Sequence, residues 1–240
     1  MKRIFDLLIA LVIIIFVLSW LLPVLALLIR WDSRGPAFFV QQRVGRHARL
    51  FKCYKLRTMV VNDQADHRPA DGDDARITLL GSWLRRSHLD ELPQFFNVLL
   101  GSMSIVGPRP YMPVDCRSFE RMVSNGHLRY CVRPGITGLA QSRGLHDVYC
   151  DREIIIQRYR CDAWYVRHAS MLLDLRILWA TGYAYAARMI ASANRSISSS
   201  WGLHWSKKKS TPSRSNAPIL SSTCAGVPAS PERKPRLETE

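Results

Sequence analysis

The longest apolar segment lies near the start of the chain, where residues 7–29 carry no charged side chain. A helix of this length reaches roughly 35 Å, which is enough to cross the hydrocarbon core of a bilayer. The segment is too long for the apolar region of a secretory signal, and no clear small-residue cleavage site follows it. We therefore predict a membrane helix here.

Two membrane arrangements fit this helix. Pro23 lacks an N–H and can break the helix, and Ser19, one turn earlier, can bond a freed backbone group. Lys2 and Arg3 precede the segment and Arg30 follows it, and basic flanks at both ends fit two cytoplasmic ends. These features favour a re-entrant helix bent at Pro23. A plain spanning helix remains open, because proline also occurs in spanning helices.

A second apolar pattern has helical spacing and consists of Leu92, Phe95, Phe96 and Leu99. Pro93 is tolerated only near a helix start, so this helix begins close to Asp90 and Glu91. Both acids then lie at a helix N-terminus, where the dipole and free N–H groups favour anions such as phosphate. On spacing alone, ordinary first-turn acids are the favoured explanation of the pair.

The remaining pattern divides the chain into three parts. Residues 1–34 form the predicted membrane anchor, and residues 35–190 form a compact α/β domain that is mainly helical. Within it, residues 171–189 are rich in Leu, Trp and Tyr but interrupted by charges, which predicts amphipathic helices at the membrane interface or packed on the core. Residues 191–240 are rich in serine and lack apolar periodicity, so we expect a disordered tail.

Charge and cysteine content narrow the classes of function. The net charge is +15, and basic proteins bind nucleic acid, anionic lipid or phosphorylated substrates. The six cysteines contain no C-x-x-C pair, which argues against a zinc site and fits reduced thiols in the cytosol. The acid-rich residues 62–76 lack the EF-hand order and indicate a surface loop.

Four ordered motifs surround the acid pair. Residues 85–110 run from Arg85 through Asp-Glu-Leu-Pro-Gln and Asn-Val-Leu to Gly-Pro-Arg-Pro. Residues 42–45 read Gln-Arg-Val-Gly, residues 54–59 read Tyr-Lys-Leu-Arg-Thr-Met, and residues 133–141 read Arg-Pro-Gly-Ile-Thr-Gly-Leu-Ala-Gln. The chain thereby resembles the bacterial sugar transferases, the monotopic polyprenyl-phosphate phosphoglycosyl transferases. It departs from their pattern at Ser102, where Asp is usual, and at His88.

The resemblance implies a bacterial enzyme of the inner (cytoplasmic) membrane, with a re-entrant helix and a catalytic domain in the cytoplasm. Such an enzyme transfers a sugar 1-phosphate from a UDP-sugar to polyprenyl (undecaprenyl) phosphate and releases UMP, which initiates exopolysaccharide or other lipid-linked glycan synthesis. Its partners would be the UDP-sugar, polyprenyl phosphate and membrane lipid, without nucleic acid. Other glycan-assembly enzymes are possible partners.

The resemblance also assigns roles to the acid pair and its neighbours. Asp90 would be the nucleophile that forms an aspartyl-phosphosugar intermediate, and Glu91 would help Asp90 hold Mg²⁺. Arg85 and Arg109 would bind phosphate oxygens.

The other substrate-binding candidates flank that centre. Pro108 and Pro110 fix the backbone of Arg109. Lys55 and Arg57 alternate along a predicted strand and would grip a diphosphate on one side, although a solvated basic strand remains open. Arg43 and Arg133 complete the set; for Arg133, a phosphate or carboxylate contact and a structural role both stay open.

Two other functions remain as alternatives. One is a membrane-tethered basic binding protein, which the net charge supports, although no recognisable nucleic-acid motif does. The other is a family member that has lost catalysis, which the departure at Ser102 motivates.

Overall fold

The computed structural model describes residues 1–62, 74–120, 122–123, 126–145 and 152–200. The chain divides into two units, Met1–Ser196 and Ile197–Glu240, and the account below concerns the first. This unit is mostly helical with little sheet, as the sequence predicts. Its α-helices are α1 (Lys2–Ile13), α2 (Ser19–Asp32), α3 (Leu79–Ser87), α4 (Gln94–Leu99), α5 (Pro113–Glu120), α6 (Leu139–Ser142), α7 (Arg152–His168) and α8 (Met171–Ser200).

Two small sheets complete the architecture. Strands β1 (Phe38–Val44) and β2 (Leu50–Leu56) form an antiparallel hairpin in which Val40 lies opposite Tyr54. Strands β3 (Ser104–Val106) and β4 (Gly135–Thr137) pair in parallel. Short 3₁₀ turns lie at Arg46–Ala48, Leu89–Glu91 and Gly126–Cys131.

The N-terminal segment is helical from Lys2 to Asp32, and the expected break at Pro23 is absent. The irregularity lies earlier, in a π-helical turn at Ile14–Leu18. Beside it, the Ser19 hydroxyl donates to the carbonyl of Ile15 at 2.6 Å and the Trp20 indole N–H donates to that of Phe16 at 3.0 Å. The π turn and these side-chain hydrogen bonds accommodate the distortion of the helix, so the helix continues through Pro23 without a break.

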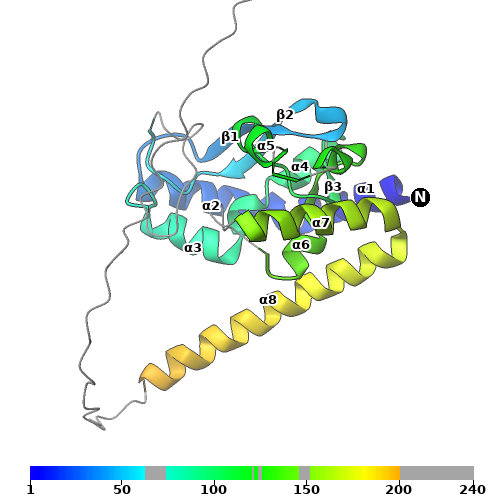
Figure 1. Ribbon diagram of the computed structural model, residues 1–240. Helices are drawn as coiled ribbons and strands as arrows, with labels where there is room; N and C mark the ends of the chain where they lie inside the picture. The colour runs from blue at the N-terminus through cyan, green and yellow to red at the C-terminus, as the bar shows by residue number, and fades with distance from the viewer. Residues whose placement is uncertain (63–73, 121, 124–125, 146–151, 201–240) are drawn as a thin grey trace, which may run out of the picture. The chain divides into compact units, whose positions relative to one another are not determined.

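Both ends of this long helix, which comprises α1 and α2 in Figure 1, are hydrogen-bonded to the rest of the unit. At the first end, Asp6 is buried and accepts hydrogen bonds from the Ser104 hydroxyl at 2.8 Å and the Ile105 amide at 3.2 Å. At the last end, the guanidinium of Arg57 donates to the carbonyls of Ile29 and Ser33. The helix therefore lies along the unit from end to end rather than projecting from it.

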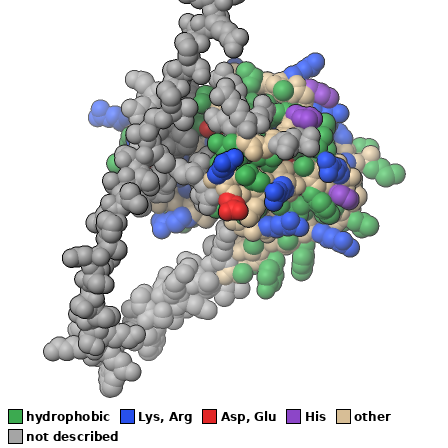
Figure 2. Space-filling model, in the orientation of Figure 1, with side chains coloured by type: hydrophobic (Ala, Val, Ile, Leu, Met, Phe, Trp, Pro, Cys, Tyr) green, Lys and Arg blue, Asp and Glu red, His purple; other side chains and the backbone are tan. Residues whose placement is uncertain are grey.

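One face of the helix packs against the core and the other is exposed and apolar. Leu18, Leu22, Leu25 and Ile29 form a buried cluster with Leu84 of α3. The exposed side chains are Ile4, Leu8, Leu11, Val12, Ile15, Phe16, Trp20, Val24, Leu27, Leu28 and Trp31. By length and composition this helix is long enough to cross a membrane. Elsewhere on the surface, Lys and Arg side chains outnumber Asp and Glu on the face shown in Figure 2.

Helix α4 lies between the N-terminal helix and the hairpin. Arg3 donates to the Val98 carbonyl at 2.7 Å on one side of α4. On the other side, the side chain of Asn97 accepts from the Tyr54 amide at 3.0 Å and donates to the Lys52 carbonyl at 2.7 Å. Asn97 thus pairs with the backbone of β2, and α4 connects the N-terminal helix to the hairpin.

Helix α8 differs from the predicted boundary of the tail. It includes residues 191–200, which we expected to be disordered, because the Ala- and Ser-rich chain continues the helix without a proline or glycine. Residues 201–240 of the predicted tail lie outside the described residues. Near its start, α8 is held by buried Asp174, which pairs with Lys2 and accepts from the Tyr165 hydroxyl at 2.7 Å.

Candidate active site

The acid pair lies on a 3₁₀ turn at Leu89–Glu91 that leads directly into α4. His88 ends α3 in the left-handed conformation, with φ of 54°, and so turns the chain between α3 and this 3₁₀ segment. The imidazole of His88 makes an edge contact with the ring of Tyr185 on α8, at 5.2 Å between centroids. The prediction that Asp90 and Glu91 precede a helix is confirmed, and both side chains are buried.

Two cations hold Glu91. Arg109 donates from both terminal nitrogens to its two carboxylate oxygens, at 2.8 and 3.2 Å, and Lys55 donates to one of them at 2.7 Å. Burial alone would raise the pKa of Glu91, but the charges of Arg109 and Lys55 outweigh it and hold that pKa well below its usual range. Glu91 therefore remains an anion that fixes both cations.

The pKa of Asp90 shifts in the opposite direction from that of Glu91. Burial raises the pKa of Asp90 to about 6, and the negative charge of Glu91 adds to the rise. Lys55, Arg85 and Arg109 lie close enough to oppose it. Asp90 is thus ionised at neutral pH but poorly solvated, which makes its carboxylate more basic and more nucleophilic than an exposed one.

Arg85 and Arg43 lie near this centre through different contacts. Arg85, at the end of α3, donates to the Thr58 hydroxyl at 2.8 Å, and its charge lowers the pKa of Asp90. Arg43, on β1, donates to the carbonyl of Pro110 at 3.2 Å. Arg85 therefore contributes charge at Asp90, whereas Arg43 supports the loop that carries Arg109.

The loop at residues 107–110 is held by close backbone packing against β4. Gly107 donates its amide to Thr137, and Gly135 donates to Pro108, both at 2.9 Å. A Cβ on Gly135 would lie 2.1 Å from the Gly107 nitrogen, so any larger residue would displace the loop. This close backbone approach between the two segments fixes the position of Arg109.

A buried arginine that the motifs did not reveal also holds Arg109. The guanidinium of Arg129 lies over the rings of Tyr111 and Tyr159, 4.3 and 4.7 Å from their centroids. It pairs with Asp162 at 3.3 Å and donates to the backbone carbonyl of Arg109. Arg129 therefore connects α7 to the backbone of Arg109, the residue whose side chain binds Glu91. The partners of Arg129 come from two segments distant from it in the sequence, residues 109–111 and α7, so no local sequence pattern indicates it.

Two predicted substrate-binding arginines lie elsewhere. Arg57 extends past the end of β2 to the last turn of α2, where it satisfies backbone carbonyls. Arg133 donates to the Gly101 carbonyl at 2.9 Å, beyond the end of α4. The structure brings Lys55, Arg85 and Arg109 around the acid pair, but it does not bring Arg57 or Arg133 there.

The acid pair fits one mode of magnesium binding. Among the residues that the structure describes, no group of three or more His, Cys, Asp or Glu side chains gathers as an all-protein metal site requires. Mg²⁺ is often held instead by one or two carboxylates together with substrate phosphates and water. Asp90 and Glu91 supply such carboxylates, although Lys55 and Arg109 already occupy much of Glu91.

Residues 1–188 match the family model described as bacterial sugar transferase, which covers both the long helix and the acid pair. The chain belongs to this family of enzymes, and the resemblance read from its motifs is confirmed.

Several curated relatives carry related names. The chain is 43% identical over 162 residues to a UDP-glucose:undecaprenyl-phosphate glucose-1-phosphate transferase of Xanthomonas campestris pv. campestris, covering 66% of this chain and 33% of the relative. It is 38% identical to the protein of the same name from Escherichia coli (strain K12), and the match covers 75% of this chain and 39% of that relative. It is 40% identical to the exopolysaccharide production protein PSS of Rhizobium leguminosarum bv. phaseoli, and the match covers 75% of this chain and 92% of that relative. This chain therefore spans about a third to two fifths of the first two relatives.

The substitution Arg129→Lys should raise the pKa of Asp90 above its value near 6. Lysine keeps a positive charge beside Asp162, but its single ammonium group cannot reproduce the fork of a guanidinium that also bonds the Arg109 carbonyl. A less firmly held Arg109 would lower the pKa of Asp90 less. Carbon-13 NMR of aspartate-labelled protein in micelles, recorded across pH, measures this change.

Arg158→Lys is the matched control. Arg158 is also buried and donates to the Leu145 carbonyl at 3.0 Å. If both variants titrate Asp90 alike, or if Arg129→Lys leaves the titration of Asp90 unchanged, Arg129 does not position Arg109.

Proposed function

We propose that this chain transfers a sugar 1-phosphate from a UDP-sugar to a polyprenyl phosphate, through a covalent intermediate on Asp90. The observation that carries the proposal is that the two acids have different environments. Glu91 binds Arg109 and Lys55, whereas Asp90 has a pKa raised to about 6. The relatives named as UDP-glucose:undecaprenyl-phosphate transferases support the choice of donor and acceptor.

In the first proposed step, a carboxylate oxygen of Asp90 attacks the phosphorus that carries the sugar. The bond from that phosphorus to the oxygen bridging the two phosphates breaks, and UMP leaves with the bond's electron pair. Arg109, held in place by Glu91, and Arg85 would stabilise the negative charge on the phosphoryl oxygens during this displacement. Lys55 would contribute positive charge to the same region.

In the second proposed step, a phosphate oxygen of the polyprenyl phosphate attacks the same phosphorus. The bond to Asp90 breaks, which regenerates the carboxylate and yields a polyprenyl diphosphate sugar. The lowered pKa of Glu91 keeps the charge of this residue constant through both steps, so the positions of Arg109 and Lys55 do not change with the state of Asp90.

Mg²⁺ is proposed as the cofactor, held by Asp90 and Glu91 together with the phosphates of the donor. When bound, it would neutralise part of the charge on the diphosphate. The basic side chains around the acid pair would also neutralise part of the charge on the diphosphate.

We further propose that the N-terminal helix is re-entrant, with both of its ends and the catalytic unit on the cytoplasmic side of the bacterial inner membrane. The support is that Asp6 near one end and Ile29 near the other are both bonded to the same unit. A straight helix that crossed the bilayer would carry these two ends to opposite sides. The helix would instead lie in the inner leaflet, with its exposed apolar face in contact with lipid.

The transfer reaction is preferred to the two alternatives because of the buried charges. A basic binding protein has no need for two buried carboxylates surrounded by three cations, since burial of charge is costly. The departure at Ser102 does not touch the acid pair: the Ser102 hydroxyl donates to the carbonyl of Asn97 at 3.1 Å at the end of α4.

Replacing Asp90 with asparagine should lower sugar-phosphate transfer on the order of 10⁴-fold or more, because the amide cannot form an acyl phosphate. Transfer of radiolabelled sugar phosphate to polyprenyl phosphate measures this loss. Asp115→Asn, on α5, is the control for removing a carboxylate elsewhere in the unit. Substantial transfer by a purified, folded Asp90→Asn protein would rule out Asp90 as the nucleophile.

Transfer should stop in excess EDTA and return when Mg²⁺ is added, because the anionic donor, acceptor and carboxylate must approach one another. The same transfer assay with and without chelator measures the requirement. Full turnover in EDTA would remove Mg²⁺ from the proposal while leaving Asp90 in place.

Both ends of the N-terminal helix should be protected from outside reagents. Single cysteines are introduced at position 2, where the side chain is 40% exposed, and at position 34, which is exposed, after the native cysteines are replaced. We expect a membrane-impermeant maleimide to label neither in intact cells and both in opened cells. Labelling of position 2 from outside, with position 34 protected, would show that the helix spans.

A further inference from the structure

Two arginines converge at the end of α4 that is farther from the acid pair. Arg3, from the N-terminal helix, donates to the carbonyls of Val98 and Met103, at 2.7 and 3.3 Å. Arg133 donates to the carbonyl of Gly101 at 2.9 Å. A Cβ built on Gly101 would lie 3.6 Å from a terminal nitrogen of Arg3, so both guanidinium groups lie against the same residue.

Capping of α4 offsets only part of this positive charge. The C-terminal end of a helix carries about half a negative charge, whereas the two guanidinium groups bring two positive ones. Among the residues that the structure describes, neither Arg3 nor Arg133 forms an ion pair with a carboxylate. Asp6, one turn from Arg3, instead accepts its hydrogen bonds from β3, and Ser102, next to Gly101, carries no charge. The two arginines therefore keep an excess of positive charge.

Arg133 also has donors available for a ligand. Within the described part of the chain, its hydrogen bond to Gly101 uses Nε, and its two terminal nitrogens bond no protein atom. Terminal guanidinium nitrogens present paired N–H groups in the geometry that fits a phosphate. Arg3 and Arg133 are both partly exposed, so an anion can reach them from outside the protein.

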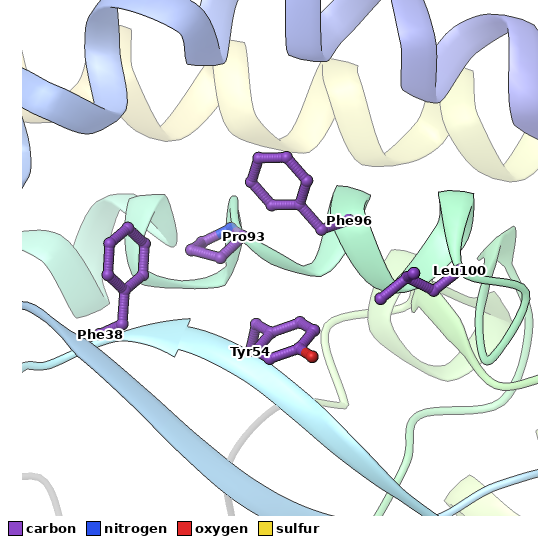
Figure 3. Close-up of a pocket in the computed structure, with 5 residues that line it drawn as sticks. All are labelled: Phe38, Tyr54, Pro93, Phe96 and Leu100. Carbon is purple, nitrogen blue, oxygen red and sulfur yellow. The ribbon is translucent and has the colours of Figure 1, made fainter.

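Exposed apolar side chains lie next to the arginine pair. Ile4, which follows Arg3, is 64% exposed, and Leu8, one turn further along the helix, is 59% exposed. Leu100, which precedes Gly101, is 70% exposed and lies at the end of α4 opposite Pro93 (Figure 3). Free phosphate gains nothing from these side chains, whereas a lipid can contact them with its acyl chains while its phosphate binds the guanidinium groups.

We propose that Arg3 and Arg133 bind the phosphate of an anionic membrane phospholipid, at a site separate from the acid pair. Asp90 precedes α4 and Gly101 follows it, and the six residues of α4 alone extend roughly 9 Å. The inference does not depend on the proposed reaction. It gives Arg133 a role at the place where the structure puts it, and the bound lipid would hold the C-terminal end of α4 at the membrane surface.

The substitution Ser102→Asp tests the site by supplying an anion from the protein itself. A carboxylate next to Gly101 can pair with either guanidinium group and take the place of the lipid phosphate. The full chain is studied in nonionic micelles. Phosphatidylglycerol should raise the midpoint of thermal unfolding of the unaltered protein by about 3 °C, because a ligand of the folded state stabilises it. Ser102→Asp should raise the midpoint without lipid and should lose the further rise with lipid.

Ser170→Asp is the matched control, because it makes the same change in charge. Ser170 is exposed and accepts a hydrogen bond from the Leu173 amide at 3.3 Å at the start of α8, a capping role that aspartate also fills. This variant should keep the full response to phosphatidylglycerol. Phosphatidylcholine and inorganic phosphate, at the same concentration, should not raise the midpoint of the unaltered protein.

Nitrogen-15 NMR of the arginine Nε groups locates the lipid directly. Phosphatidylglycerol should shift the signal of Arg133, which is assigned from its loss in Arg133→Lys. The signal of Arg57 should not move, because that buried guanidinium is bonded to carbonyls at the end of α2. This measurement uses the unaltered protein, so it decides the proposal even if Ser102→Asp fails to fold.

Four results would overturn the proposal. The first is a response to phosphatidylglycerol in Ser102→Asp equal to that of the unaltered protein. The second is an equal loss of response in Ser170→Asp, which would indicate an effect of net charge alone. The third is an equal response to inorganic phosphate, which would make the ligand a free anion rather than a lipid. The fourth is an Arg133 signal that phosphatidylglycerol does not move.

Discussion

The pairing of Glu91 with Arg109 and Lys55 is the interaction on which the site depends. A carboxylate buried without partners would be protonated or would destabilise the fold, but two cations keep this one ionised. It joins the hairpin, the acid pair and the loop at residues 107–110 in one contact. Its negative charge also helps to raise the pKa of the adjacent Asp90. Two neighbouring carboxylates thereby acquire different chemistry from their surroundings.

The rest of the structure supports this contact from several directions. Arg129 holds the backbone of Arg109 from the side of α7, and Gly107 and Gly135 bring the loop against β4 without space for a side chain. Asn97 connects α4 to the backbone of β2 and so fixes the position of Lys55 relative to the acid pair. These supports are buried and hydrogen-bonded, which reduces the freedom that the charged groups lose when they bind a substrate.

The sequence predicted the parts of the site that depend on local patterns. The position of Pro93 and the apolar spacing after it correctly located the acid pair before a helix. The alternation of Lys55 and Arg57 correctly indicated a strand, yet β2 ends at Leu56 and Arg57 extends instead to the end of α2. Arg129 and the π turn at Ile14–Leu18 were not predicted, because both follow from contacts between distant segments or from local helix register. Which charged residues meet is decided by tertiary packing, which no single motif contains.

The central claim is that Asp90 becomes covalently attached to the sugar phosphate. The most direct measurement is mass spectrometry of the purified protein after incubation with a UDP-sugar and Mg²⁺ in the absence of acceptor, with rapid quenching to preserve an acyl phosphate. The account predicts release of UMP in amounts matching the enzyme, and a sugar-phosphate mass on the peptide that contains Asp90, removed when polyprenyl phosphate is added. UMP that appears only when acceptor is present, with no modified peptide before it, would contradict the account and indicate direct transfer between the two substrates.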